Sequence, residues 1–293
     1  HSYREMPIRY FEFGTVYRHE MSGAVHGLMR ARGFTQDDAH VFCREDQVVD
    51  EVCAILDLAD MIMGEFGFEY AAEISTRPEK SIGTDEMWDK AESFLREAIE
   101  RRGIPYDLNE GDGAFYGPKI DFHLRDSIGR TWQCGTIQLD MLMPEKFDLT
   151  YVGEDGEKHR PVMLHRVVYG SIERFIGILI ENYAGAFPTW LAPVQVRILP
   201  ITDKHADYAY ELKKKMFDLG LRVEVDDRNE KTGYKIRESQ VKKTPYTLVV
   251  GDQEMADGTA AVRKRGVKDS EVMKVDDFIK YVQEKIASKS EEF

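Results

Sequence analysis

The chain has 293 residues and a net charge of −13, and a length prior of about 150 residues per domain predicts two domains. An apolar content of 42% excludes a disordered acidic chain, and the acidic surplus argues against a protein whose whole surface attracts nucleic acid. Three cysteines (Cys43, Cys53 and Cys134) are too few for a disulfide framework, which favours a reducing, cytoplasmic setting. No apolar run is long enough to span a bilayer, so no membrane partner is expected.

The first 192 residues predict strands and helices in an irregular order. Because Arg9 to Tyr17 is already typical of a strand, we expect the chain to begin inside a larger domain. The other expected elements are, in chain order, a polar loop over 19–28, a strand ending near 42, helices over 45–66 and 85–102, short strands over 119–124, 131–139 and 148–152, and an apolar helix over 171–183.

The pattern changes after a rigid aromatic connector, Phe187 to Pro193. Strands are expected over 194–200, 222–226, 246–251 and 259–265, and helices over 206–219, 232–242 and 275–287. This alternation predicts a compact α/β domain with a mostly parallel sheet. We therefore expect residues 1–192 to form one domain and residues 193–293 a second. The second is nearly neutral, which permits contact with a polyanion on one face.

The segment from Arg30 to Cys43 holds the most informative pattern. If it is a strand, its period of two places Phe34, Gln36, Asp38 and His40 on one face. Polar groups are costly to bury unless they are paired, so these side chains suit a small polar ligand, or a metal bound through His40. The alternative is a solvated sheet face with one hydrogen-bonded histidine.

The arginines that flank the polar loop, Arg18, Arg30 and Arg32, form a second group. Arg18 ends the first strand and Arg30 begins the next, so both can converge across the loop, where guanidinium groups suit phosphate or carboxylate. The alternative is cross-strand ion pairing, for example with Glu20. Arg174 is the one basic residue in the apolar helix and needs an anionic partner, either a ligand phosphate or a carboxylate of its own helix.

A turn flanked by Gly113 and Gly117 aims Tyr116 and precedes Lys119, which could neutralise a phosphate or carboxylate. The turn lacks the spacing of a Walker A loop, and the alternative is a hairpin with an exposed lysine. His165 lies in an apolar run, where a lone histidine is more often a hydrogen-bonded core residue than a ligand. Two histidines could nevertheless share one zinc ion with a third protein ligand.

Together these motifs resemble a known family. The segments 18–20 and 30–34 resemble motif 2 of class II aminoacyl-tRNA synthetases, and the segment 170–174 resembles motif 3. Within the class, the segments 33–40, 77–80, 113–119 and 133–140 resemble bacterial threonyl-tRNA synthetases, and the resemblance covers essentially the whole chain. It implies an α+β catalytic core with a mainly antiparallel sheet, followed by a smaller α/β anticodon-binding domain with a mixed sheet.

The resemblance implies a threonine–tRNA ligase that activates threonine with ATP and transfers it to threonine tRNA. The implied catalytic residues are Arg18, Lys119 and Arg174. The implied ATP-binding residues, with Mg²⁺ at the phosphates, are Arg18, Glu20, Arg30, Phe34, Gln133 and Arg174. The implied threonine-binding residues are Gln36, Asp38, Tyr116 and Gln138. The implied anticodon-binding residues are Asn229, Arg237, Glu254 and Arg263, with lysines such as Lys235 at the tRNA phosphates.

The resemblance also implies a zinc ion held by His40, His165 and a cysteine. In the family, that cysteine and motif 1, which builds the dimer interface, precede the part that matches this chain. We therefore expect a catalytically incomplete piece of an enzyme that is a homodimer when intact. Asp38 and zinc would both engage the threonine hydroxyl, which distinguishes threonine from the nearly isosteric valine. The alternatives are a class II synthetase for proline or serine and a synthetase-like RNA-binding protein.

Overall fold

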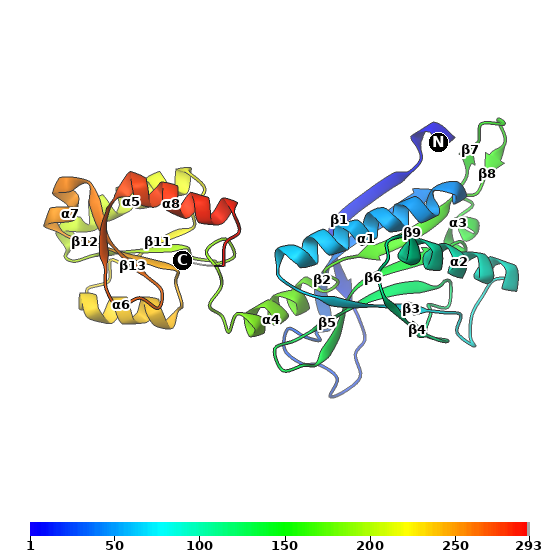
Figure 1. Ribbon diagram of the computed structural model, residues 1–293, viewed down its shortest axis with the longest axis horizontal. Coiled ribbons are helices and arrows are strands. Elements are labelled where there is room, and N and C mark those ends of the chain that lie inside the picture. The colour runs from blue at the N-terminus through cyan, green and yellow to red at the C-terminus, as the bar shows by residue number, and fades with distance from the viewer. Residues whose placement is uncertain (292–293) are drawn as a thin grey trace. The chain divides into compact units, whose positions relative to one another are not determined.

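The computed structural model describes residues 1–291. Its contacts divide the chain into two compact units, His1–Glu181 and Asn182–Phe293 (Figure 1). The aromatic connector groups with the second unit, where Gln195 donates to the carbonyl of Thr189 and Arg222 donates to that of Trp190. Within the described part of the chain, no helix combines the length and the apolar character that a membrane crossing needs.

A seven-stranded sheet organises the first unit. In spatial order its strands are β1 (Ile8–Tyr17), β2 (Gly33–Cys43), β9 (Val162–Val167), β6 (Thr131–Asp140), β5 (Lys119–Arg125), β3 (Tyr70–Ser75) and β4 (Tyr106–Asn109). All neighbours are antiparallel except β3 and β4, which are parallel. The mainly antiparallel core that the resemblance implied is confirmed.

One face of this sheet is apolar and the other is polar. On β5, Ile120, Phe122 and Leu124 are fully buried, whereas Lys119 and His123, which alternate with them, lie on the opposite face. Two long helices pack against each other and lie together across the sheet in Figure 1. They are α1 (Val48–Glu65) and α2 (Asp85–Arg101). The helices therefore cover the apolar face, and the polar face of the sheet is the one that can hold a ligand site.

The first unit also contains several smaller elements. They are α3 (Met143–Lys146), the two-stranded hairpin β7 (Tyr151–Val152) and β8 (Lys158–His159), and α4 (Ile172–Asn182). The strand expected over 148–152 is thus realised only as β7. Sequence reasoning missed β3, β4 and β9. In β9 the polar neighbours His165 and Arg166 interrupt the apolar run, so its periodicity is weak.

The second unit has a five-stranded sheet with the order β11 (Val223–Val225), β10 (Val196–Pro200), β12 (Tyr246–Val250), β13 (Thr259–Lys264) and β14 (Glu271–Lys274). β10 is parallel to β11 and β12, while β13 is antiparallel to β12 and β14. The mixed sheet implied by the resemblance is confirmed, and the expectation of a mostly parallel sheet was wrong. Only the short helix α7 (Asp252–Asp257) joins β12 to β13, too little chain for a parallel crossover.

The core of the second unit lies on one side of its sheet. Figure 1 shows α5 (Ala206–Asp218) and α8 (Val275–Ala287) together on one face and α6 (Thr232–Val241) on the other. The buried apolar cluster joins the sheet to α5 and α8 and includes Ile198, Leu248 and Phe278. On the α6 side the buried groups are polar, because the Ser239 and Thr247 hydroxyls bond each other at 2.6 Å. The two faces of this sheet therefore differ in chemistry.

Candidate active site

A cavity of about 210 Å³ on the polar face of the first sheet brings together residues that lie far apart in the sequence. Its walls come from the end of β1, the loop before β2, β2, β6 and the start of α4. Eight predicted site residues line it: Arg18, Glu20, Arg30, Phe34, Gln36, Gln133, Gln138 and Arg174. The lining is mainly polar and carries three guanidinium groups, as a site for a multiply charged anion requires.

The first two arginines are already engaged by neighbours. The Arg18 guanidinium lies 5.2 Å from the centre of the Phe34 ring, which is buried. Arg30 donates to the Glu20 carboxylate over 2.9 Å, so the ion pair weighed in the sequence analysis is present. More than half of the Arg30 side chain is exposed, and an incoming phosphate could displace this pair at modest cost.

Arg174 is held by backbone carbonyls. Its Nε donates to the carbonyl of Met29 over 2.8 Å, its Nη1 donates to that of Gln133 over 2.6 Å, and its guanidinium lies 5.5 Å from the Trp132 ring. Burial lowers the pKa of Arg174, and the nearby positive charge of Arg30 acts in the same direction. The side chain is thus fixed beside the cavity without a carboxylate on its charge.

The two carboxylates of α4 bind other partners, so of the two alternatives for Arg174 the pairing with its own helix is not formed. Both oxygens of Glu173 accept from the backbone N–H of Thr35, at 3.0 and 2.9 Å. Glu181 pairs with Arg130 at 3.3 Å. Ser171 caps the helix by accepting a hydrogen bond from the backbone N–H of Arg174. The start of α4 is therefore tied to β2.

Asp37 makes the second tie between β2 and α4, and sequence reasoning missed it. Its buried carboxylate accepts the backbone N–H groups of Val168, Tyr169 and Gly170 at 2.8, 3.2 and 3.0 Å. Burial raises the pKa of this carboxyl, while the three N–H groups act to lower it. The signal in the sequence was an acidic residue on the otherwise apolar face of a predicted strand, which demands a specific partner.

A second cluster adjoins the cavity along the sheet. His40 and His165 are direct partners across β2 and β9, with ring centres 4.9 Å apart. Asp38 Oδ1 lies 3.9 Å from the Nδ1 atom of His40, and burial lowers the pKa of His40 although the Asp38 charge opposes this. On the other side, Gln138 lies directly opposite His165 in the register of β6 and β9, and it accepts a hydrogen bond from the Tyr116 hydroxyl. Three predicted threonine-binding residues, Asp38, Tyr116 and Gln138, therefore lie around one histidine pair.

Lys119 is a buried partner of two carboxylates and not the exposed hairpin lysine offered as the alternative. Its ammonium donates to Asp121 over 2.6 Å and to Asp112 over 3.1 Å, and its side chain is only 13% exposed. Burial lowers the pKa of this lysine, but the two carboxylates raise it more, so the net shift is upward. Asp121 also accepts from the Gln133 amide over 2.6 Å, which links the lysine to the cavity wall.

The two imidazoles have the chemistry of zinc ligands, because borderline-soft Zn²⁺ favours neutral histidine nitrogen. Within residues 1–291, no group of three metal-ligating side chains whose ligand atoms all lie within 4.8 Å of one another includes these two histidines. The group that does gather three such side chains is Glu73, Asp121 and His123, with ligand atoms within 4.8 Å of one another. Since the Lys119 ammonium already binds Asp121, one of the two carboxylates of this group, a cation there would meet like charge. The histidine pair remains the better zinc candidate.

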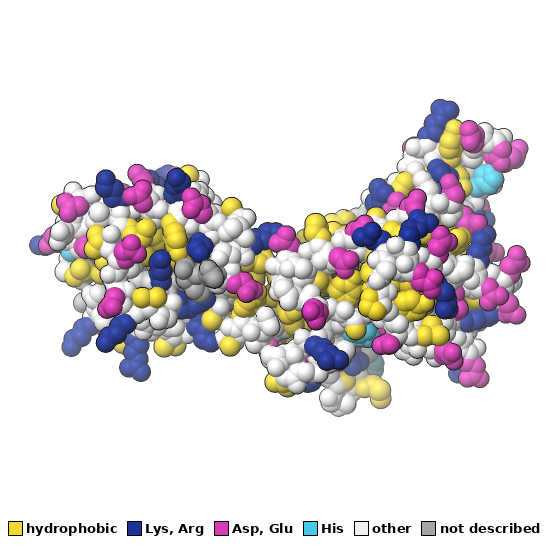
Figure 2. All heavy atoms as spheres, viewed as in Figure 1, with side chains coloured by type: hydrophobic (Ala, Val, Ile, Leu, Met, Phe, Trp, Pro, Cys, Tyr) yellow, Lys and Arg dark blue, Asp and Glu magenta, His cyan; other side chains and the backbone are white. Residues whose placement is uncertain are grey.

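The four predicted anticodon residues lie on several elements of the second unit. Asn229 is exposed after β11, Arg237 is exposed on α6, Glu254 lies in α7, and Arg263 lies on β13. Glu254 accepts from the N–H of Gly251 over 2.9 Å, and the Nε atom of Arg263 is buried without a hydrogen-bond partner. Arg237 lines a hollow of about 170 Å³ on α6. Figure 2 shows Lys and Arg side chains along the margin where Figure 1 places α6.

Two basic residues near α6 are structural. Lys235, which sequence reasoning offered as a phosphate contact, is buried and donates to the carbonyl of Asp226 over 2.9 Å, so that expectation was wrong. Arg228 binds the Asp226 carboxylate through two nitrogens at 2.8 and 2.7 Å and also reaches Glu238. These contacts hold α6 against the residues that follow β11.

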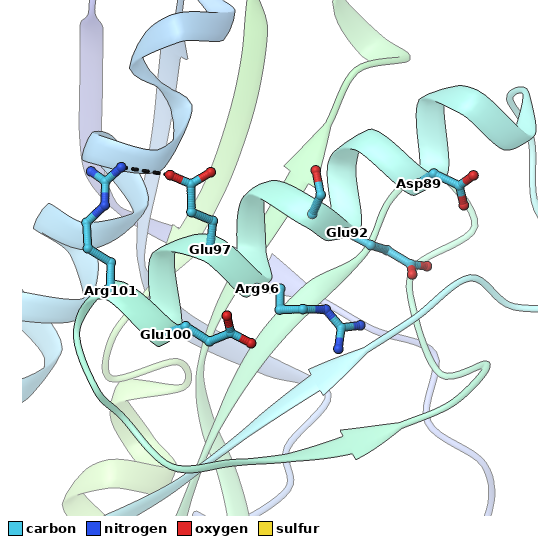
Figure 3. Close-up of a pocket in the computed structure, with 7 residues that line it drawn as sticks. Asp89, Glu92, Arg96, Glu97, Glu100 and Arg101 are labelled. Carbon is cyan, nitrogen blue, oxygen red and sulfur yellow. Dashed lines mark hydrogen bonds and ion pairs between the residues drawn. The ribbon is translucent and has the colours of Figure 1, made fainter.

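A surface depression of about 630 Å³ lies on α2, away from both clusters. Figure 3 shows that its lining residues project from one helix, α2, and the only ion pair drawn among them is that of Glu97 with Arg101. Most of these side chains are exposed, and residues of both charges lie along a single helix face. An i, i+4 pair on a solvated face contributes a few tenths of a kcal/mol, about 0.3–0.5, and needs no ligand to explain it.

Comparison with known proteins adds independent findings. Residues 1–183 match the tRNA synthetase class II core domain (G, H, P, S and T), and residues 195–285 match an anticodon binding domain. The threonine–tRNA ligase of Carboxydothermus hydrogenoformans is 65% identical over 92% of this chain and 42% of its own length. That of Desulforamulus reducens is 62% identical over 99% of this chain and 46% of its own length.

A solved structure is similar over most of its own chain. The crystal structure of the RNA binding domain of threonyl-tRNA synthetase from Cryptosporidium parvum Iowa II has a TM-score of 0.91 at 40% identity, over 97% of this chain and 72% of that one. The present chain spans less than half the length of the curated relatives that it matches.

Proposed function

Since this chain belongs to the class II aminoacyl-tRNA synthetases, among the threonine–tRNA ligases, we propose that it activates threonine with ATP and transfers the threonyl group to threonine tRNA. The observation that carries the proposal is the adjacency of two clusters on one sheet face. A cavity with three arginines meets a histidine pair with amide, carboxylate and phenol groups beside it. The first suits a nucleotide and the second a small polar amino acid.

In the proposed reaction the arginines bind ATP. Arg18 would hold the α-phosphate against the threonine carboxylate, and Phe34, which already stacks on that guanidinium, would take the adenine. Arg30 and Arg174 would bind the terminal phosphates with Mg²⁺, Glu20 would lie beside them, and Gln133 would lie near the ribose. Guanidinium groups fixed before the substrate arrives stabilise the charge that develops during acyl transfer to phosphate. Lys119 would lie near the adenylate.

Specificity for threonine would come from the second cluster. Gln36, Tyr116 and Gln138 would contact the amino and carboxylate end, and Asp38 would accept the hydroxyl hydrogen bond. His40 and His165 would hold zinc together with a cysteine supplied from outside this chain. When bound, the ion would take the amino and hydroxyl groups of threonine as ligands. Valine lacks the hydroxyl and would leave Asp38 unpaired, which a purely apolar pocket could not achieve.

The second unit would read the tRNA anticodon. Asn229, Arg237, Glu254 and Arg263 present hydrogen-bonding groups of the kind that recognise the edges of unpaired bases. The full protein would work as a homodimer in the cytoplasm, and its domains would divide at 192/193. A competing function is RNA binding without catalysis, which the match of residues 195–285 to an anticodon binding domain favours.

The test is ATP–pyrophosphate exchange by this chain with threonine, serine, valine or proline as the amino acid. Exchange with threonine, weaker exchange with serine and almost none with valine would support the proposal. Serine retains the hydroxyl and loses one methyl group, worth about 1–3 kcal/mol. Absence of exchange together with tight binding of threonine tRNA would favour the RNA-binding alternative. Exchange with proline would contradict the proposed specificity.

A further inference from the structure

Asp140 is a buried carboxylate that the proposed reaction does not use. It ends β6, and none of its surface is exposed. Its Oδ1 atom accepts the backbone N–H groups of Leu142 and Met143 at 2.8 and 2.9 Å. Its Oδ2 atom lies 3.0 Å from the Nε2 atom of His165. The two backbone contacts fix the orientation of the carboxylate, so its second oxygen is held against the imidazole.

The contact defines which ring nitrogen carries the proton. An ionised carboxylate has only acceptor atoms, so the bond can form only if Nε2 of the imidazole donates. In the neutral ring Nδ1 is then the nitrogen with the lone pair. We infer that Asp140 is a positioning residue that holds His165 as the Nε2–H tautomer with Nδ1 ready to bind a cation. The inference rests on the proposed function only for the identity of that cation as zinc.

The surroundings agree with this role. His165 is only 22% exposed at its side chain and lies between His40 and Gln138 in the sheet register, so its ring cannot turn freely into solvent. The Tyr116 ring also lies against it, with its centre 5.6 Å from that of the His165 ring. A histidine that binds metal commonly donates its other N–H to such a carboxylate.

One substitution separates the backbone contacts of Asp140 from its effect on the imidazole. In Asp140→Asn the amide oxygen can replace Oδ1 and keep the two backbone bonds, while the amide NH₂ faces the ring. A donor there requires a lone pair on Nε2, so the histidine should change to the Nδ1–H tautomer. Asp38→Asn is the matched control, because it alters the carboxylate beside the other histidine and leaves this contact intact.

The experiment is nitrogen-15 NMR of histidine side chains in the metal-free chain at about pH 8, above the ordinary histidine pKa of about 6.5. The signals of His165 are identified by their loss in His165→Gln. We expect a protonated Nε2 in the wild type and in Asp38→Asn, and a protonated Nδ1 in Asp140→Asn. A wild-type ring with the proton on Nδ1 would overturn the inference, and this arm needs no variant of Asp140 to fold.

A zinc titration forms the second arm. Competition with a chromophoric chelator should show that Asp140→Asn binds Zn²⁺ about 10–100-fold more weakly than the wild type, as is usual for loss of such an outer contact. Equal affinities would contradict the positioning role. Threonine-dependent exchange is a separate assay, so its failure would count against the proposed function while leaving the tautomer result unaffected.

Discussion

Asp37 offers the sharpest test of how the site is held together. Its carboxylate accepts three backbone N–H groups from residues 168–170, and these residues lead directly into α4. Asp37→Asn keeps the shape of the side chain but only one acceptor oxygen. The better orientation places that oxygen where Oδ2 accepts two of the bonds, which leaves the N–H of Gly170 facing an amide donor.

The cost follows from this count. One buried, unsatisfied N–H destabilises a fold by about 1–3 kcal/mol. With a urea m-value of about 2 kcal/mol per M, the unfolding midpoint should fall by about 0.5–1.5 M. Asp37→Ala leaves all three N–H groups without partners and should cost about 3 kcal/mol or more. The number of lost hydrogen bonds therefore predicts that stability decreases from the wild type to the Asn variant and then to the Ala variant.

The assay is urea unfolding followed by tryptophan fluorescence. Trp88 and Trp132 lie in the unit that contains Asp37, and Trp190 lies in the other, so the two transitions can be fitted separately. Asp38→Asn is the control, because Asp38 lies on the opposite face and is partly exposed. The free energy of unfolding of this variant should differ from that of the wild type by less than about 0.5 kcal/mol. Equal midpoints for wild type and Asp37→Asn, or an equal loss in the control, would refute the reasoning.

Three further predictions concern other parts of the first unit. Asp38→Ala should lower the ratio of kcat/KM for threonine over valine at least about tenfold in the exchange assay, because the hydroxyl loses its acceptor, and an unchanged ratio would remove this residue from the specificity site. Burial raises the pKa of Asp126, but hydrogen bonds from indole and guanidinium groups lower it more and hold it at about 2, below its ordinary 3.8. The stability advantage of the wild type over Asp126→Asn should therefore be complete above pH 3.8 and vanish as the pH falls through about 2, and a gap in urea midpoints that is independent of pH would contradict this. Gly117→Ala would place a Cβ atom 1.8 Å from the Leu139 carbonyl and should lower the melting temperature, whereas Gly64→Ala in α1 meets no atom within 4 Å and should not.

Local patterns predicted much of the fold because they reflect local physics. The helix α8 begins and ends at the predicted residues, and α2 ends just before Gly103, whose positive φ of 65° is typical of a glycine that follows a helix end. The period of two in β2 correctly separated a polar face from a buried one. By contrast, β9 pairs with strands that are distant in the sequence, and its own residues carry no clear alternation. Its place in the sheet depends on contacts that no short window contains.

The candidate site likewise has some features that the sequence predicted and others that it did not. Residue types predicted which groups gather, since arginines, amides and histidines in these spacings suit a nucleotide and a polar ligand. They did not predict that backbone carbonyls hold Arg174, because every residue has a carbonyl and none is marked in the sequence. Nor did they predict the role of Asp140, whose partners are two backbone N–H groups and a histidine 25 residues away.

The two buried aspartates explain how a sheet can carry such a site reliably. β9 lies between β2 and β6, so the histidine pair exists only in one register, and a slip by one residue would turn His165 to the apolar face. Asp37 binds the backbone just beyond the end of β9 from β2, and Asp140 binds His165 from β6. Each contact requires the same alignment of the three strands. A buried carboxylate without its donors is costly, so both residues penalise every other register and thereby fix the geometry of the active site.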